Sequence, residues 1–500
     1  MISRKEIKAY ANQSPRFDDM ICSLPAAPKI PKAMVGETRK VIAIARKFNE
    51  AVVRPHALEL DRRMHENPDY LPWDLVEKIN DWGLYTLWIP KIFGGQGYNM
   101  PSMCYFVEEI ASSCLAIANL IGVHYLGVCT LTSTWNMRLI NHVCREVKLG
   151  EKNHTPCLVS LAITEPNAGT DVEETDLIDK GNITCHAEKV PGGYKLNGTK
   201  IFISNGHLST WHMVIAYSDL NKPADKAVVL AVKTGTPGFS FGRKERKMGQ
   251  KACPASELIF KDCFVADEFV CLDPEQVTAN RRPPREIYMQ MIDYVVSATR
   301  AGVGAFATGA ARGAFETALK FASETVVAGK PLIHHEWAQC RLSEMYKNVA
   351  MSRLTYVETN YANGLYGAFR ELQKKPMYYY YKMMPAIWLD KLIPPLMNKP
   401  AMTRLFRKQK MDGQTDEEIH RTSGWASLSK FGATDLGVKN CQMALEMMGE
   451  AGLRHDRGAE KILRDAKLLQ IYEGTNQLNR LNLFKCLIAG DYPPVTVFDE

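Results

Sequence analysis

One carboxylate stands alone in the second half of the segment RDAKLLQIYEGTNQLNR, residues 464–480. It belongs to Glu473, which follows a tyrosine, precedes a glycine and has a hydroxyl and two amide side chains directly behind it. A carboxylate that is shielded from water has a raised pKa and can act as a general base. The same residue could instead be an acid at a helix N-terminus that interacts with the helix dipole, with Thr475 and Gln477 in the first turn.

A second polar segment, ITEPNAGTDVEE, covers residues 163–174 and opens a region rich in β-branched residues. Its Asn167-Ala168-Gly169 run lets a ligand approach the backbone closely, while Thr164 and Thr170 offer hydroxyls. The segment is either a ligand-binding loop or a plain loop with polar turn residues. The other glycine-rich run, FGGQGY, lacks the G-x-G-x-x-G spacing of a dinucleotide-binding turn and is interpreted as a turn.

The run KIFISNG places an aromatic residue, Phe202, two positions before a hydroxyl, Ser204. Two residues separated by one position lie on the same face of a β-strand. Phe202 and Ser204 could therefore cover one side of a flat ligand, although an ordinary core position for Phe202 explains the pattern equally well.

The composition is that of a globular protein with two or three domains, with 500 residues, 46% hydrophobic and 23% charged. The charged N-terminus lacks the apolar run of a signal peptide, and no window reaches the roughly 18 uninterrupted apolar residues of a membrane span. We therefore expect a soluble, cytoplasmic protein. The 13 cysteines are odd in number and form no C-x-x-C motif, which favours reduced core thiols over disulfides, and no metal site is expected.

The net charge of +7 is concentrated in one segment, because residues 365–410 contain ten Lys or Arg and only two acids. The rest of the chain is nearly neutral. A basic segment without a basic fold behind it does not indicate nucleic-acid binding, which we therefore exclude.

Three regions differ in periodicity. Apolar residues recur at helical spacing between about residues 38 and 149, strand-like alternation follows, and helical runs return from about residue 284. Within the strand region, Asn197-Gly198 between two strand-like runs predicts a hairpin turn. The expected fold class is mainly α with a β middle domain (α+β). The predicted domains are an N-terminal helical domain (1–155), a central β-barrel-like domain (156–284), a C-terminal helical bundle (285–490) with an insertion at about 365–421, and a tail (491–500).

Five motifs together resemble the acyl-CoA dehydrogenase family. LAITEPNAGTD is similar to the flavin-contacting loop of that family, KIFISNG to its flavin-stacking strand, and KMGQKACPASELIFKDCFV to the closing strands of its middle domain. ATRAGVGAFATGAARGAFETALKFA resembles the first C-terminal helix, and the segment around Glu473 resembles the catalytic segment. The order and spacing match over roughly residues 40 to 490.

The resemblance implies an FAD-dependent oxidoreductase in which Glu473 abstracts the α-proton of an acyl-CoA while hydride passes from the β-carbon to flavin. The backbone N–H of the same turn, with a flavin ribityl hydroxyl, would stabilise the enolate-like oxygen. By resemblance, the FAD-binding residues are Leu161, Ile163, Thr164, Gly169, Thr170, Phe202, Ile203, Ser204, Thr475 and Gln477.

The residues implied to bind the substrate are Thr170, Arg300, Tyr472 and Gly474. Arg300 matches an arginine that lies near the CoA moiety in relatives. The family usually has an acid three residues before it, where this chain has Ser297.

Residues that contact FAD from a second subunit are lost. The family has an arginine, a phenylalanine, two glutamines and a glycine where this chain has Thr325, Ala328, Glu336, Glu446 and Glu450. Three added acids would repel a pyrophosphate. The pattern favours a hetero-oligomer in which a homologous subunit supplies these contacts. The rival is a homo-oligomer in which Lys330, Arg341 or a basic residue of the insertion binds the phosphate.

The insertion, RELQKKPMYYYYKMMPAIWLDKLIPPLMNKPAMTRLFRKQK, is aromatic, methionine-rich, interrupted by prolines and basic. It is expected to be a cap on the helical domain with a solvated basic face, or else a contact with a partner protein or an anionic membrane surface through residues 365–410.

The expected reaction is dehydrogenation of an acyl-CoA with an electron-transferring flavoprotein as acceptor. The alternatives are an acyl-CoA oxidase that uses oxygen and a non-catalytic or regulatory subunit of a hetero-oligomeric complex. The stretch CYFVEEIASSCLAIANL, which lies near the acyl pocket in relatives, contains no basic residue and so disfavours a substrate with a carboxylate tail.

Overall fold

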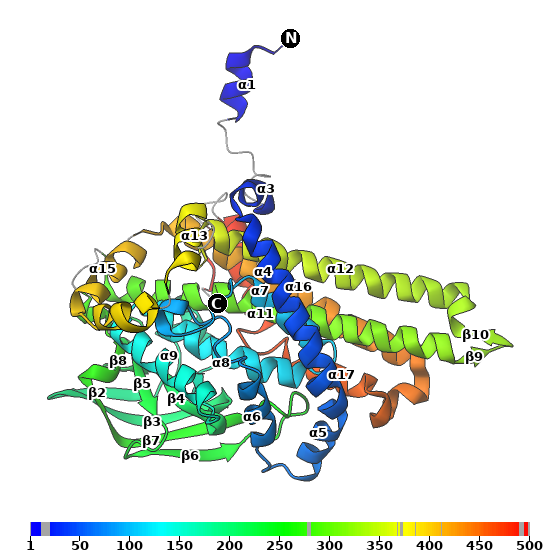
Figure 1. Cartoon of the computed structure of the whole chain (residues 1–500), viewed down its shortest axis with the longest axis horizontal. Coiled ribbons are helices and arrows are strands. Elements are labelled where there is room, and N and C mark those ends of the chain that lie inside the picture. Colours follow the sequence, from blue (N-terminus) through cyan, green and yellow to red (C-terminus); the bar gives the residue numbers. More distant parts are fainter. Residues whose placement is uncertain are drawn as a thin grey trace.

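The computed structural model describes residues 2–11, 21–277, 282–367, 369–370, 374–385, 387–411, 413–489 and 495–498. Figure 1 shows a layer of long helices, with the β-strands gathered at one end and a hairpin at the opposite end. The predicted order of a helical part, a β part and a second helical part is confirmed. The predicted tail, 491–500, falls mostly outside the described residues.

The first helical part packs most of its apolar residues into one core that it shares with the C-terminal helices. Its longest helix, α8, follows a nearly continuous apolar sequence and lies under the sheet. The main helices are α1 (Arg4–Ala11), α3 (Ser23–Ala26), α4 (Lys32–Phe48), α5 (Arg54–Glu66), α6 (Trp73–Asp81), α7 (Ser102–Ala111), α8 (Leu115–Ser133) and α9 (Met137–Lys152).

Helix α8 is long and apolar enough to cross a membrane by length and composition alone. However, 78% of its most apolar window is buried inside the protein, where the helix packs on β1 (Leu158–Ala162) and α11 (Pro284–Glu324). An interior helix of a globular protein passes the same test, so α8 is a core helix.

The strands form one mixed sheet with the order β6-β7-β3-β2-β4-β5-β8, and β1 pairs in parallel with β4. Fully buried runs such as those of β4 and β5 explain the β-branched sequence of this region. The strands after β1 are β2 (His186–Val190), β3 (Gly193–Ser204), β4 (Ser209–Tyr217), β5 (Ala227–Lys233), β6 (Phe239–Lys244), β7 (Ala255–Ala266) and β8 (Val270–Leu272).

The predicted hairpin turn at Asn197-Gly198 is wrong, because both residues lie inside the long strand β3. The β2–β3 turn is instead at Pro191-Gly192, next to the pair Val190 and Gly193. Gly198 has a φ of +137° at a shift of the β3–β7 register, and a Cβ there would lie 2.7 Å from the Cys185 backbone. Pairing with two neighbours along β3 thus overrides the local turn preference of Asn-Gly.

Three long helices build the C-terminal part, α11, α12 (Glu336–Leu365) and α16 (Asp416–Met448), which pack side by side. Thr415 and Glu418 form a capping box that starts α16. A two-stranded hairpin, β9 (Val326–Val327) and β10 (Lys330–Pro331), joins α11 to α12 at the end of the molecule farthest from the sheet (Figure 1). Helices α17 (Ala459–Leu468) and α18 (Asn476–Leu483) follow α16.

The insertion lies between α12 and α16 and folds into short helices that pack on α9 and on the 3-10 segment η3 (Lys91–Phe93). They are α13 (Lys375–Met383), the π-helical segment η10 (Trp388–Leu392), α14 (Ile393–Met397) and α15 (Pro400–Met411). The expected cap on the helical domain is thus present, but its main contacts are with α9 and η3 of the N-terminal part and not with the helices that flank the insertion.

The 13 cysteines lie almost entirely in the interior. Ten of them are buried, Cys129 and Cys486 are partly buried, and Cys340 on α12 is exposed. Burial raises the pKa of the Cys104 and Cys144 thiols to about 12. The cysteines therefore serve mainly as small core residues.

Candidate active site

Glu473 lies in the turn between α17 and α18. Its φ of +57° is in the left-handed region, which residues other than glycine rarely adopt. Two side chains hold this conformation, because Arg300 Nε and Asn479 Nδ2 each donate a hydrogen bond to the Glu473 carbonyl oxygen at 3.2 Å. The direction of the carboxylate is thus set by contacts from α11 and α18, and a non-glycine residue held in such a conformation is a frequent mark of a functional site.

The Glu473 carboxylate is partly buried. Burial raises its pKa above the ordinary value, while a hydrogen bond from Thr299 and the charges of Arg300 and Lys430 oppose the rise. Thr299 Oγ1 donates to Glu473 Oε2 at 2.8 Å. The side chain therefore binds a proton more tightly than an exposed glutamate does, as a general base that works near neutral pH requires.

Gly474 follows with a φ of +75°, and its surroundings leave no room for a side chain. A Cβ there would lie 3.0 Å from Glu173 Oε2 and 3.2 Å from Arg300 Nη2. Its carbonyl oxygen accepts a 2.6 Å hydrogen bond from Lys430 Nζ, and burial lowers the pKa of Lys430 to about 7. The turn thus combines a strained backbone with a buried amine on α16.

A second partly buried carboxylate, Glu173, faces the same turn from the 3-10 segment η4 (Thr170–Glu173). Its Oε2 lies 3.7 Å from Arg300 Nη2, whose side chain is only 1% exposed. Burial and repulsion from Glu473 raise the pKa of Glu173 to about 7, against the opposing charges of Arg300 and Lys430. Arg300 therefore has a carboxylate beside it, although the acid expected three residues earlier is Ser297.

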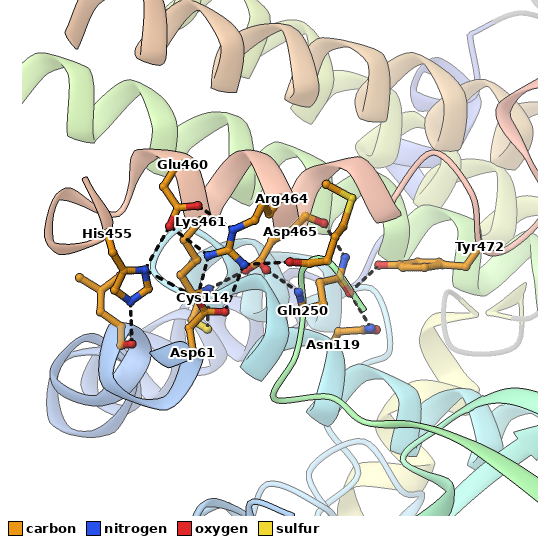
Figure 2. Close-up of polar contacts among 12 residues, drawn as sticks. Asp61, Cys114, Asn119, Gln250, His455, Glu460, Lys461, Arg464, Asp465 and Tyr472 are labelled. Carbon is orange, nitrogen blue, oxygen red and sulfur yellow. Dashed lines mark hydrogen bonds and ion pairs between the residues drawn. The ribbon is translucent and has the colours of Figure 1, made fainter. Parts of the chain in front are cut away.

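A polar network fixes α17, the helix that leads into the Glu473 turn (Figure 2). Arg464 forms ion pairs with Asp61 of α5 at 2.7 Å and with Glu460 at 2.6 Å. The fully buried pair of Lys461 and Asp465 is 2.6 Å apart. These contacts hold α17 against the N-terminal helices, so the turn that follows starts from a fixed position.

The same network reaches Tyr472, next to Glu473, through Gln250 in the loop before β7 (Figure 2). Gln250 Nε2 donates to the Asp465 carbonyl oxygen, and its Oε1 accepts hydrogen bonds from Asn119 of α8 at 2.8 Å and from the Tyr472 hydroxyl at 3.4 Å. Tyr472, which was predicted to bind the substrate, thus uses its hydroxyl inside the protein. Its substrate contact stays a prediction.

In the part of the chain that the structure describes, the side chains of Asp61, His455 and Glu460 come close enough together to bind a metal ion. Arg464 forms ion pairs with both carboxylates. Their charges are therefore already matched within the protein, and the group carries no metal proposal.

The predicted flavin loop and the predicted flavin strand lie together. Ile201 N of β3 donates to the Thr164 carbonyl oxygen at 2.9 Å. Below them, the buried Lys200 Nζ bonds the Ile163 carbonyl oxygen and Glu165 Oε1, both at 2.8 Å. The loop that begins at Thr164 also carries Glu173, so it connects the strand to the Glu473 turn.

Phe202 is suited to cover a flat ring. The β3–β7 register shifts between Lys200 and Ile203, and within this bulge Phe202 has a φ of +57°. Its side chain is 54% exposed, whereas neighbouring Ile203 is 2% exposed. A large aromatic side chain held outward by a strained backbone fits a ligand-stacking role, and the alternative of a core position for Phe202 is wrong. The bulge also means that the alternation used to pair Phe202 with Ser204 does not hold at this point.

The remaining predicted FAD residues are spread over three elements. Leu161 is on β1, Gly169 and Thr170 are at the start of η4, and Thr475 and Gln477 are at the start of α18. Thr475 caps α18 by accepting a 3.2 Å hydrogen bond from Leu478 N, and Gln477 is exposed. The alternative interpretation placed both residues in the first turn of a helix, which holds for Gln477, whereas Thr475 is the N-cap. The FAD contacts of these residues stay predictions.

The predicted partner-side positions lie away from this site. Thr325 and Ala328 are at the hairpin at the far end of α11, opposite the sheet (Figure 1). Glu446 on α16 forms an ion pair with Arg341 on α12, and both side chains are exposed. Arg341, named as a possible phosphate ligand, therefore already has an acidic partner.

Sequence reasoning missed Glu173, Thr299, Lys430 and Asn479. Thr299 precedes Arg300, which the resemblance singled out. Glu173 and Asn479 lie within the two polar segments quoted above but were not named, and Lys430 carries no local signal. Lys430 in particular is a single lysine within a helical pattern, and only the packing of α16 against the turn brings it to the site.

The family models that match this chain all describe domains of one protein family. Three family models match: the acyl-CoA dehydrogenase N-terminal domain over residues 36–135, the middle domain over 160–263, and the C-terminal domain over 289–363 and 402–488. The third match leaves out residues 364–401, which overlap the segment predicted to be an insertion.

Similar proteins cover nearly the full chain. Acryloyl-CoA reductase (NADH) of Anaerotignum propionicum is 27% identical, with 90% of this chain and 94% of the relative aligned. Butyryl-CoA dehydrogenase of Megasphaera elsdenii superposes with a TM-score of 0.68 at 22% identity, covering 90% of this chain and 98% of that one. A chain solved in work on the electron transferring flavoprotein of Acidaminococcus fermentans gives a TM-score of 0.69 at 22% identity, with 90% and 98% covered.

Proposed function

The chain belongs to the acyl-CoA dehydrogenase family, and we propose that it catalyses the α,β-dehydrogenation of an acyl-CoA thioester with Glu473 as the base. The observation behind this proposal is the Glu473 turn. A partly buried carboxylate with a raised pKa is held at a φ of +57° by hydrogen bonds from two helices. Strain and desolvation combined at one carboxylate are costly for a purely structural residue.

In the proposed reaction Glu473 takes the α-proton, and the β-hydrogen leaves with its electron pair, so that a C=C bond forms. FAD, when bound, supplies the acceptor for that hydride. Thr164, Phe202 and Ser204 would hold its ring system, and Thr475 and Gln477 its adenylate side. The backbone N–H of Glu473 would donate to the thioester oxygen and stabilise the negative charge that develops there.

The acceptor proposed for the electrons is an electron-transferring flavoprotein. The structural similarity to a chain from the Acidaminococcus fermentans flavoprotein work supports this proposal. The oxidase alternative predicts consumption of oxygen during turnover, so an oxygen electrode separates the two. A cytoplasmic location stays a prediction.

We propose an acyl group without a terminal carboxylate. Helix α7 carries Glu108 and Glu109. The two arginines that reach this helix are already paired with these acids. Arg353 Nη2 lies 2.6 Å from Glu108 and Arg312 Nη1 lies 2.7 Å from Glu109. A panel of acyl-CoA substrates with an artificial acceptor tests this proposal, and faster turnover of a dicarboxylic acyl-CoA would contradict it.

The test of the proposed function is Glu473→Gln, which preserves the shape of the side chain but cannot accept a proton. The variant is expected to keep its fold and any bound flavin, while the rate of anaerobic flavin bleaching by substrate falls at least about a hundredfold. Glu188→Gln, at an exposed acid on β2, is the matched control and should bleach normally. Bleaching of the Glu473 variant at the wild-type rate would contradict the assignment.

A further inference from the structure

We propose that the insertion binds the surface of an anionic lipid bilayer. The docking surface is the outer face of residues 374–385 and 387–411, called the basic cap below. The proposal rests on the exposure, charge and anchoring of this segment and is independent of the catalytic assignment.

The basic cap is fixed to the rest of the protein by its inner face. Tyr378, Leu389 and Met397 are buried there. Arg407 donates to the carbonyl oxygens of Thr134 and Cys271 at 3.1 and 2.9 Å. The outer face is therefore presented by a packed segment and not by a loose chain.

The outer face of the basic cap is apolar along one side. Trp388, Leu392 and Leu396 are 46%, 61% and 43% exposed, and their spacing of four residues places them on one side of the helical segment. The other exposed apolar residues of the cap are Met377, Tyr379, Tyr380, Met383, Ile387 and Leu405. Nine large apolar side chains are thus exposed on one short segment, and a concentration of exposed apolar residues of this kind marks an interaction site.

The charge around this patch is almost entirely positive. Residues 374–410 contain nine Lys or Arg and one acid, Asp390, which forms an ion pair with Lys148. Four of the basic residues, Lys391, Lys399, Arg404 and Lys408, are exposed, and their side chains form no ion pair or hydrogen bond within the described ranges of the chain. An anionic partner would satisfy all four.

An anionic bilayer accepts both features at once, since aromatic and leucine side chains enter the interfacial layer and lysines contact the headgroups. A second copy of the chain fits less well, because a symmetric contact would bring the same positive surface against itself. Each lysine or arginine near such a membrane strengthens binding about fivefold.

The test uses the purified full-length protein and vesicles of phosphatidylcholine with or without phosphatidylglycerol. We expect sedimentation only with the anionic vesicles, release by high salt, and a blue shift of tryptophan fluorescence that is absent in Trp388→Ser. The variant Lys391→Glu/Lys399→Glu/Arg404→Glu/Lys408→Glu should lose at least about a hundredfold in affinity.

The matched control reverses four exposed lysines outside the cap, Lys40, Lys47, Lys152 and Lys222, and so changes the net charge equally. Equal loss of binding in both variants, or no binding by the wild type, would overturn the proposal. A cap variant that changes the oligomer mass instead would assign the surface to a contact between protein chains and would also overturn it.

Glu173, which was not among the predicted site residues, lies beside Arg300. We infer that Glu173 is a positioning residue that serves as counter-ion to Arg300 and titrates together with Glu473. This inference deepens the proposed function and rests on it only for the role of Glu473 as base.

The geometry places Glu173 among all the charges of the site. Arg300 faces it from α11, Lys430 from α16 and Glu473 from the turn after α17, while the Tyr288 hydroxyl lies close enough to be influenced by its charge. Two polar atoms that face each other, Glu173 Oε2 and Arg300 Nη2, have no hydrogen-bond partner among the described residues. A carboxylate 3.7 Å from a buried guanidinium compensates that charge, and the same guanidinium supports the Glu473 carbonyl oxygen.

The Glu173 and Glu473 carboxylates repel each other when both are ionised. Protonation of one therefore makes it easier for the other to lose its proton. Glu173→Gln removes one negative charge, so the Glu473 carboxylate ionises at lower pH. The acidic limb of the pH profile for flavin reduction is therefore expected to move down by about one pH unit. Glu173→Asp keeps the charge and should restore the wild-type limb.

The control is Glu174→Gln, which removes a neighbouring charge that pairs with Lys485 and does not contact Arg300. An unmoved limb in Glu173→Gln, or an equal shift in Glu174→Gln, would overturn the inference. Infrared titration of the carboxyl bands in both Glu173→Gln and Glu473→Gln reports the coupling without turnover. If the coupling is seen while Glu473→Gln still bleaches flavin, the proposed function fails and the inference stands.

Discussion

Burial and three neighbouring side chains together determine the pKa of the Glu473 carboxyl group. Burial raises its pKa, and the Thr299 hydroxyl, Arg300 and Lys430 each oppose that rise. A base of this kind can be tuned in either direction by one substitution, because its partners come from different elements and can be removed separately.

Thr299→Val tests this balance by removing the hydrogen bond that stabilises the ionised carboxylate. The pKa of Glu473 is expected to rise, so the acidic limb of flavin reduction moves up by about one pH unit, opposite to the shift for Glu173→Gln. Thr317→Val is the control, since Thr317 donates to the Gly313 carbonyl oxygen on the same helix. A downward shift in Thr299→Val would contradict the described hydrogen bond.

At the scale of elements, the β3 strand shows what a sequence pattern can and cannot predict. Its β character and its pairing with neighbouring strands follow from alternation and β-branched residues. Its bulges do not, because at each bulge one strand has one residue more than the other between two neighbouring pairs, and the local pattern does not mark where this happens. For this reason the predicted turn at Asn197-Gly198 is wrong. The outward position of Phe202 also depends on a bulge, which the alternation of side chains along a strand does not predict.

Phe202 and Ile203 are neighbours on this bulge with opposite exposure, so alanine variants of the two can be compared directly. Phe202→Ala is expected to leave the thermal midpoint nearly unchanged, since the ring is 54% exposed, and to reduce FAD retention at least about tenfold. Ile203→Ala should cost about 3 kcal/mol of unfolding free energy, because that side chain is 2% exposed. Urea unfolding and flavin absorbance after gel filtration measure both effects. Equal destabilisation by the two variants would argue against the outward position of Phe202.

The insertion is a second element whose structure the sequence predicted only in part. Its sequence predicted a basic, aromatic cap, but not which residues face inward. Removing the whole segment would uncover Tyr378, Leu389 and Met397 together with the α9 surface that they cover. Charge reversal on the outer face is therefore a cleaner test of its role than deletion.

At the scale of the whole molecule, the order of the three parts was predictable from motif order, while the catalytic role of the Glu473 segment stays a prediction. The buried charges around Glu473 were not, since they come from α11, α16 and η4, which are distant in sequence. The contacts of a second subunit could be inferred only from residues that differ from the family pattern, such as Glu446 and Glu450.

We predict that the chain expressed alone retains FAD weakly, and that a homologous subunit with the expected arginine and glutamines restores one flavin per heterodimer. The physical reason is repulsion between added acids and a pyrophosphate. Glu446→Gln/Glu450→Gly should increase FAD retention by a homo-oligomer of the chain. Native mass spectrometry measures both, and a homotetramer of the unaltered chain that carries four FAD would contradict the prediction.

The exposure of Cys340 gives the molecule a natural labelling site. The other cysteines are buried or partly buried, and the pKa of thiols such as Cys144 is raised to about 12, so they have little thiolate at neutral pH. A maleimide dye should therefore attach once, on α12, next to Arg341 and its ion pair with Glu446. The rate of this labelling reports directly whether another chain covers that face, without any mutation of the protein.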